Sequence, residues 1–66
     1  MEVVSAPLAP LRRAVLEQLR EAGSASEVAT RLGETRQRVN YHVRELERAG
    51  LVELVEERAR RGWFRR

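Results

Sequence analysis

The amino-acid sequence predicts a mainly α-helical domain that ends in a small β-hairpin. Residues 8–22, 25–32 and 36–49 each carry apolar residues at helical spacing. Residues 51–66 instead combine aliphatic and β-branched residues with a later Trp-Phe pair around a polar stretch, which is typical of two short strands. A length of 66 residues allows one domain with a small core, and no linker or internal repeat divides it.

The first predicted helix, residues 8–22, alternates an apolar face with a charged one. Pro10 suits the first turn of a helix, where its missing N–H costs no hydrogen bond. Gly23 suits the left-handed residue that often follows a helix. The charged face is interpreted as solvated, and no role is assigned to its residues, which are Arg12, Arg13, Glu17, Arg20 and Glu21.

The second and third predicted helices carry recognisable signals at their ends. Ser24 and Glu27 form a capping box, in which the serine hydroxyl accepts from the Glu27 N–H and the carboxylate reaches back to the serine N–H. Gly33 ends the second helix, Thr35 caps the third, and Gly50 ends the third. Two helices joined by a short glycine-containing turn form a helix-turn-helix, and the following hairpin makes it a winged helix-turn-helix.

The turn Gly33-Glu34-Thr35 is flanked by residues that fit this motif. Close crossing of two helices needs a small residue on the first and an aliphatic residue on the second, and Ala29 and Val39 occupy those positions. The second helix of the motif enters the major groove of DNA. The sequence therefore predicts a domain that binds double-stranded DNA through a recognition helix over residues 36–49.

Candidate DNA-binding residues lie on the face of the recognition helix opposite its buried side, counted at about 100° per residue. Gln and Asn can pair bidentately with adenine and Arg with guanine, while Tyr can reach a phosphate or a thymine methyl. The residues expected to read bases are Gln37, Asn40, Tyr41 and Arg44. Thr35 and Arg36 are expected to contact phosphates, with Arg38 at the flank of the face. The alternative is an ordinary polar helix face, although no Glu precedes Glu45 in this helix.

Positive charge is concentrated in the second half of the chain. Residues 1–33 hold four Arg and four Glu, whereas residues 34–66 hold nine Arg and six Glu. Every basic residue is Arg and every acidic residue is Glu, a bias that a GC-rich genome would also produce. Three Arg residues of the predicted wing loop are expected to contact phosphate or the minor groove, the alternative being a flexible cationic loop; they are Arg58, Arg60 and Arg61.

The stretch Arg31 to Val52, with the sequence RLGETRQRVNYHVRELERAGLV, resembles winged-helix transcription regulators of the ArsR kind, with the MarR kind as a near neighbour. Its Ala-Gly-Leu-Val ending carries most of the resemblance, which extends from about Leu8 to Phe64. The resemblance implies transcription regulation, with repression as the expected form. Glu34 departs from the family, which usually has an apolar residue there, and the lack of a cysteine pair at the recognition helix argues against metal sensing.

A homodimer is expected, because the core is small and helix-turn-helix proteins usually bind paired half-sites. The resembled family commonly dimerises through an N-terminal element and a helix after the wing. Either further residues follow Arg66 in the natural protein or dimerisation uses another element. Trp63 and Phe64 alternate across a strand, so one is expected in the core and the other on the outside.

Other classes of function find little support in the sequence. The lack of cysteine excludes a disulfide framework and favours a cytoplasmic location, and no apolar run of about 18 residues predicts a membrane span. No cofactor and no catalytic residue are expected, because Asp and Cys are absent and His42 is the single histidine. His42 is interpreted as a structural residue and not a metal ligand. The alternative function is a winged-helix module for protein interaction in a transcription-related assembly.

Overall fold

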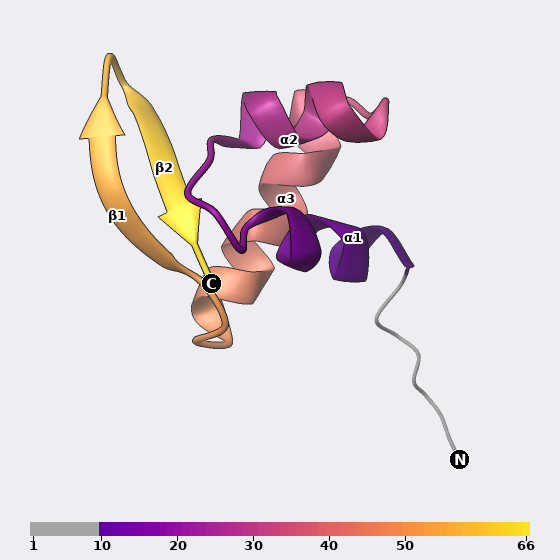
Figure 1. The fold of residues 1–66 in the computed structure, drawn as a ribbon, viewed down its shortest axis with the longest axis horizontal. Helices are drawn as coiled ribbons and strands as arrows, with labels where there is room; N and C mark the ends of the chain where they lie inside the picture. The colour runs from indigo at the N-terminus through magenta and orange to yellow at the C-terminus, as the bar shows by residue number, and fades with distance from the viewer. Residues whose placement is uncertain (1–9) are drawn as a thin grey trace.

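Residues 10–66, which the computed structural model describes, form three helices and a two-stranded antiparallel sheet (Figure 1). The helices are α1 (Pro10–Gln18), α2 (Ala25–Leu32) and α3 (Arg36–Arg48), and the strands are β1 (Glu53–Arg58) and β2 (Arg61–Arg65). The hairpin stands beside the three helices, with its tip at the level of α2. This arrangement is a winged helix-turn-helix fold. No helix within residues 10–66 is long and apolar enough to cross a membrane.

One hydrophobic core joins the helices to the wing. Its members are each no more than 6% exposed, and they come from α1, the residue after α1, α2, α3, the segment after α3, and β2: Val15, Leu19, Val28, Ala29, Val39, Val43, Leu46, Val52 and Phe64. Leu11, Leu16, Ala25 and Leu32 pack around this core and are partly buried. Because a domain of this size buries little apolar surface, the position of α3 and the wing depends on these few residues.

The bend between α2 and α3 has the geometry of a helix-turn-helix. Gly33 adopts a left-handed conformation at φ +67°, and a Cβ there would meet no atom within 4 Å, so the backbone conformation alone favours glycine. The Thr35 hydroxyl accepts from the Arg38 N–H at 3.1 Å and begins α3. Ala29 and Val39 are buried on either side of the bend, as the sequence predicts.

The start of α2 carries half of the predicted capping box. The Ser24 hydroxyl accepts a hydrogen bond from the Glu27 N–H at 3.2 Å. Among the described residues, no return hydrogen bond from the Ser24 N–H to the Glu27 carboxylate is present. Ser24 is completely buried, so its hydroxyl satisfies a backbone donor inside the protein, where an unpaired donor would be costly.

The first helix is shorter than residues 8–22. Residues 8 and 9 lie outside the described part of the chain, and α1 ends at Gln18. The Leu19 N–H contacts the carbonyls of both Val15 and Leu16 at 3.2 Å, and the chain then leaves the helix. Gly23 is not the left-handed cap that we expected: it is buried and forms a β-bridge with Phe64. This pairing with β2 draws residues 19–23 away from the helix axis.

The third helix also ends one residue earlier than expected. Ala49 is its C-cap and is exposed, so it does not continue the buried face of the helix. Gly50 is left-handed at φ +77°, and the following Leu51 N–H donates to the Leu46 carbonyl at 2.9 Å. Gly50 is therefore the terminating glycine that the sequence predicts.

The wing strands extend through the stretch that the sequence predicts as a loop. Arg58 and Arg61 are paired across the hairpin, and only Ala59 and Arg60 form the turn, at φ 50° and 65°. The prediction that Arg58, Arg60 and Arg61 all lie in the wing loop was therefore wrong. Of these three residues, only Arg60 lies in the turn. Two-residue turns with positive φ match the right-handed twist of paired strands, which explains the tight hairpin despite the lack of Gly or Asn.

Candidate nucleic-acid interface

The outer face of α3 presents a continuous row of polar side chains to solvent. Val39, Val43 and Leu46 hold the opposite face in the core. Each of the seven residues predicted from Thr35 to Arg44 is exposed: Thr35, Arg36, Gln37, Arg38, Asn40, Tyr41 and Arg44. Of the large apolar side chains among residues 10–66, Tyr41 is the most exposed, at 58%. This face is free to contact a macromolecule along more than two helical turns.

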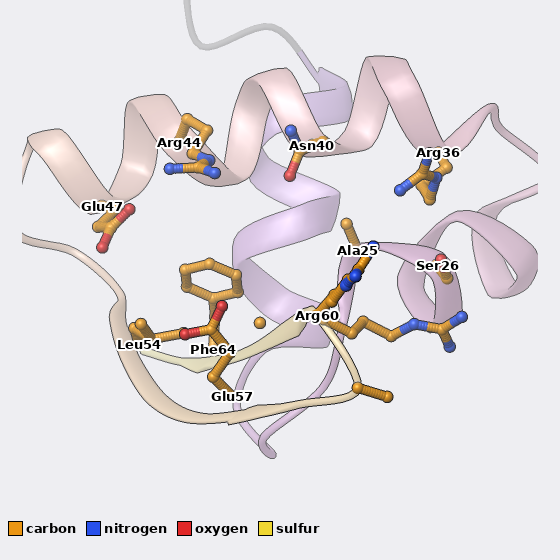
Figure 2. A pocket seen from close by; sticks show the side chains of 13 residues that line it. Ala25, Ser26, Arg36, Asn40, Arg44, Glu47, Leu54, Glu57, Arg60 and Phe64 are labelled. Atoms are coloured by element: carbon orange, nitrogen blue, oxygen red, sulfur yellow. The ribbon is translucent and has the colours of Figure 1, made fainter.

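An open cleft of about 520 Å³ separates α3 from the wing (Figure 2). Arg36, Asn40 and Arg44 stand four residues apart along α3 and line one wall of this cleft. Arg60 and Arg61 line it from the tip of the wing, while Ala25 and Ser26 contribute from the start of α2. Leu54, Gly62 and Phe64 supply apolar lining on the wing side.

The cleft is electropositive. It is lined by four Arg residues, Arg36, Arg44, Arg60 and Arg61, against two Glu residues, Glu47 and Glu57. Among the described residues, none of these four guanidinium groups takes part in an ion pair, whereas Arg20, Arg38, Arg48, Arg58 and Arg66 each pair with a Glu. The cleft therefore offers charge and hydrogen-bond donors that fit the oxygen atoms of phosphate groups.

Two of the predicted DNA-contact residues, Arg38 and Arg58, already form ion pairs with Glu side chains of the protein itself. The Arg38 guanidinium pairs with Glu34 at 3.2 Å, one turn back on the same surface. Arg58 holds the Glu56 carboxylate with two hydrogen bonds of 3.0 and 3.1 Å and lies 5.0 Å from the centre of the Trp63 ring. Arg58 does not line the cleft. Both Arg residues are less available to phosphate than the four in the cleft.

The wing aromatics divide as the sequence predicts. Phe64 is 6% exposed and belongs to the core, while Trp63 lies on the other face of β2 under Arg58. The Trp63 Nε1 atom is buried and has no partner among the described residues. Of the two wing aromatics, Phe64 lines the cleft and Trp63 does not.

His42 lies between α3 and α1. Its Nδ1 accepts a hydrogen bond from the Arg12 Nε at 3.1 Å, so the imidazole is neutral at that nitrogen. Burial, together with the charges of Arg12 and Arg38, lowers the pKa of His42 below its ordinary value, and Glu34 and Glu45 oppose this shift. No group of three or more potential metal-ligating side chains occurs within residues 10–66.

Comparison with protein families agrees with this geometry. Residues 8–55 match the family model of the helix-turn-helix domain, which covers most of the chain. The chain belongs to this helix-turn-helix family. No curated protein and no solved structure shows a significant match. Membership indicates a DNA-binding domain with a role in transcription regulation. The matched segment ends in β1 and does not include the second strand of the wing.

Sequence reasoning missed two parts of this helix-turn-helix interface. Arg12 was assigned to a solvated face, yet it contacts His42 and lies 5.9 Å from the centre of the Tyr41 ring. The cleft lining by Ala25 and Ser26 was also missed. Both depend on contacts between elements that are distant along the chain. The exposed position of Arg12 on a helical wheel gives no signal of the partner that it meets.

Proposed function

We propose that this helix-turn-helix domain binds double-stranded DNA in a sequence-specific way and represses transcription, as regulators of the ArsR-like kind do. The observation that carries the proposal is the joint placement of α3 and the wing tip around one cationic cleft. The major groove admits an α-helix, and the exposed face of α3 has the length and polarity to enter it. The DNA backbone that borders the major groove then fits in the cleft between α3 and the wing.

The contacts divide into two roles. Gln37, Asn40, Tyr41 and Arg44 read base edges, because their amide, hydroxyl and guanidinium groups project from the exposed side of α3. Phosphates are bound by Thr35, Arg36, Arg60 and Arg61. Arg38 and Arg58 contribute less, since each is paired with a Glu in the free protein. Asn40 and Arg44 also line the cleft, so the two roles meet at these two residues.

Arg60 carries a further indication of a functional role. It adopts a left-handed backbone at φ 65°, which is strained for a residue with a Cβ. Glycine or asparagine would suit this position in the turn better. A long cationic side chain at the tip of the wing offsets this local cost if it contacts the DNA backbone.

We also propose that the domain acts as a homodimer on DNA. A single recognition helix gives one monomer few base contacts, and two half-sites about one helical turn apart would double them. Repression follows from occupation of promoter DNA by such a dimer. Two-fold symmetry of the protein predicts a palindromic binding sequence.

Selection of bound sequences from a random duplex pool tests this function directly. The expected result is an enriched palindrome whose half-sites lie about 10 base pairs apart. The Gln37→Ala variant should change the enriched sequence. Arg20→Ala, on the ion pair with Glu17, is the matched control and should enrich the same sequence as the native protein. Failure of the native protein to enrich any sequence contradicts sequence-specific binding, and a single unrepeated half-site contradicts the dimer.

A further inference from the structure

Tyr41 has an unusual position among the proposed base-reading residues. Its ring is more than half exposed on the outer face of α3, where a side chain normally samples several rotamers. Ordering such a ring when DNA binds costs conformational entropy, which weakens the complex. A group that orders the ring in the free protein would reduce that cost.

Two side chains hold the Tyr41 ring. His42 meets it edge to face, with the ring centres 5.3 Å apart and the planes at 68°. The Arg12 guanidinium lies 5.9 Å from the centre of the ring, within reach of a cation–π interaction. Arg12 also donates from Nε to His42 Nδ1 at 3.1 Å. The Arg12 cluster, formed by Arg12, Tyr41 and His42, thus connects α1 to the exposed face of α3.

The Nε hydrogen bond is what makes Arg12 suited to this task. A guanidinium group is planar, so a hydrogen bond from Nε to His42 fixes the plane that the Tyr41 ring meets. Arg12 itself is half-buried and comes from α1, which is anchored in the core by Val15. The orientation of Tyr41 therefore depends on a helix that lies outside the helix-turn-helix.

From this arrangement we propose that Arg12 is a positioning residue for DNA recognition, which acts by ordering the Tyr41 side chain before DNA binds. The inference rests on the proposed function and adds a specificity-determining residue to it. Arg12 itself does not contact the DNA backbone. Its effect on affinity and on sequence preference should pass entirely through Tyr41.

A double-mutant cycle with Arg12→Met and Tyr41→Ala tests this inference in the full chain. Met keeps an apolar stem of similar length but removes the cation and the Nε donor. Arg13→Met is the matched control, because Arg13 is the exposed neighbour on the same helix. We expect Arg12→Met to weaken binding to the selected duplex by about threefold in the native background and to have no effect in the Tyr41→Ala background.

Two more measurements separate positioning from simple folding effects. Arg12→Met should change the sequence preference at the same base pairs as Tyr41→Ala, whereas Arg13→Met should change none. In the free protein, the Tyr41 ring resonances in NMR spectra should shift with Arg12→Met and stay in place with Arg13→Met. If Arg12→Met melts at a much lower temperature, Arg12→Lys replaces it, since Lys keeps the cation and loses the Nε geometry.

The outcomes are distinct. An equal loss with and without Tyr41, together with a slope of log affinity against log salt that is shallower by about 0.9, would show a direct phosphate contact and overturn the inference. Unchanged Tyr41 resonances in both Arg12 variants would also overturn it. Neither result affects the proposed function, because the native protein still selects its sequence. If the native protein selects no sequence, both proposals fail.

Discussion

Gly23 and Phe64 exchange two backbone hydrogen bonds, of 2.9 Å and 2.8 Å, and so attach the second wing strand to the segment between α1 and α2. The Arg66 N–H adds a third bond to the Leu19 carbonyl at 2.9 Å. At its base, β2 is therefore held on one edge by β1 and on the other by Gly23. This fixes the direction of the wing relative to α2 and α3, which keeps the cleft in one shape.

Packing at Gly62 should control the stability of the wing. A Cβ at this position would lie 3.0 Å from Phe64 Cε1 and 3.1 Å from Leu54 Cδ1, closer than ordinary contact. Because Phe64 is fixed in the core, we expect Gly62→Ala to lower the free energy of unfolding by about 1–3 kcal/mol, measured by urea denaturation. The loss should shrink in a Leu54→Ala background, where one crowded neighbour is gone. An equal loss in both backgrounds would speak against crowding at Leu54.

The turn at the wing tip offers a stabilising change. Ala59 has φ 50°, which costs an alanine more than an asparagine. We expect Ala59→Asn to raise the free energy of unfolding by about 0.5–1 kcal/mol and to leave DNA affinity unchanged, since Arg60 and Arg61 remain. Ala22→Asn is the control: among the described residues, Ala22 is not one of the positive-φ positions, and it is also exposed. A gain of the same size in the control would mean that turn strain is not the cause.

Some features of the fold could be predicted from the sequence and others could not. The bend at Gly33, the Thr35 cap and the buried Val39 were predictable, because each is a local pattern with a local cause. The wing turn was not, because Ala59 and Arg60 are not typical turn residues. The bridge from Gly23 to Phe64 was not either, since nothing near Gly23 in sequence reveals a partner in β2.

The candidate site follows the same division. Helical periodicity predicts which side chains of α3 are exposed, and each side chain predicted for the DNA-binding face is exposed. It cannot show that Arg58 stacks on Trp63 and pairs with Glu56, or that Arg12 reaches across to α3. Those contacts depend on how α1 and the wing pack against the rest of the domain.

Stability should depend on pH through His42. Burial and the neighbouring guanidinium groups lower the pKa of His42 in the folded protein, so the unfolded chain takes up the proton first as the pH falls. The contribution of His42 is complete above the unfolded pKa of about 6.5 and is lost as the pH falls from there toward the folded pKa. We expect Tm to fall as the pH is lowered below about 6.5.

The variant His42→Gln isolates this effect. Glutamine keeps a hydrogen-bond acceptor for Arg12 and does not titrate, so its Tm should change less over the same range. Thermal unfolding followed by circular dichroism gives both curves. Parallel curves for the native protein and the variant would show that other groups, and not His42, account for the pH dependence.

Loss of a base contact and loss of a DNA-backbone contact should change DNA binding in different ways. Gln37→Ala removes a base contact and is expected to cost about 1–3 kcal/mol on the selected duplex, with a lower ratio of specific to random-duplex affinity. The double variant Arg60→Ala with Arg61→Ala removes backbone contacts from the wing side of the cleft. It should weaken binding to both duplexes and leave their ratio nearly unchanged.

The salt dependence of binding by the Arg60→Ala, Arg61→Ala double variant tests the central claim most directly. Affinities of the native and double-variant proteins for the selected duplex and for a random duplex are measured at several salt concentrations. If α3 and the wing bind one DNA backbone between them, the slope of log affinity against log salt becomes shallower by about 0.9 for each phosphate contact removed. An unchanged slope, with the loss confined to the selected duplex, would contradict the assignment of the wing to the DNA backbone.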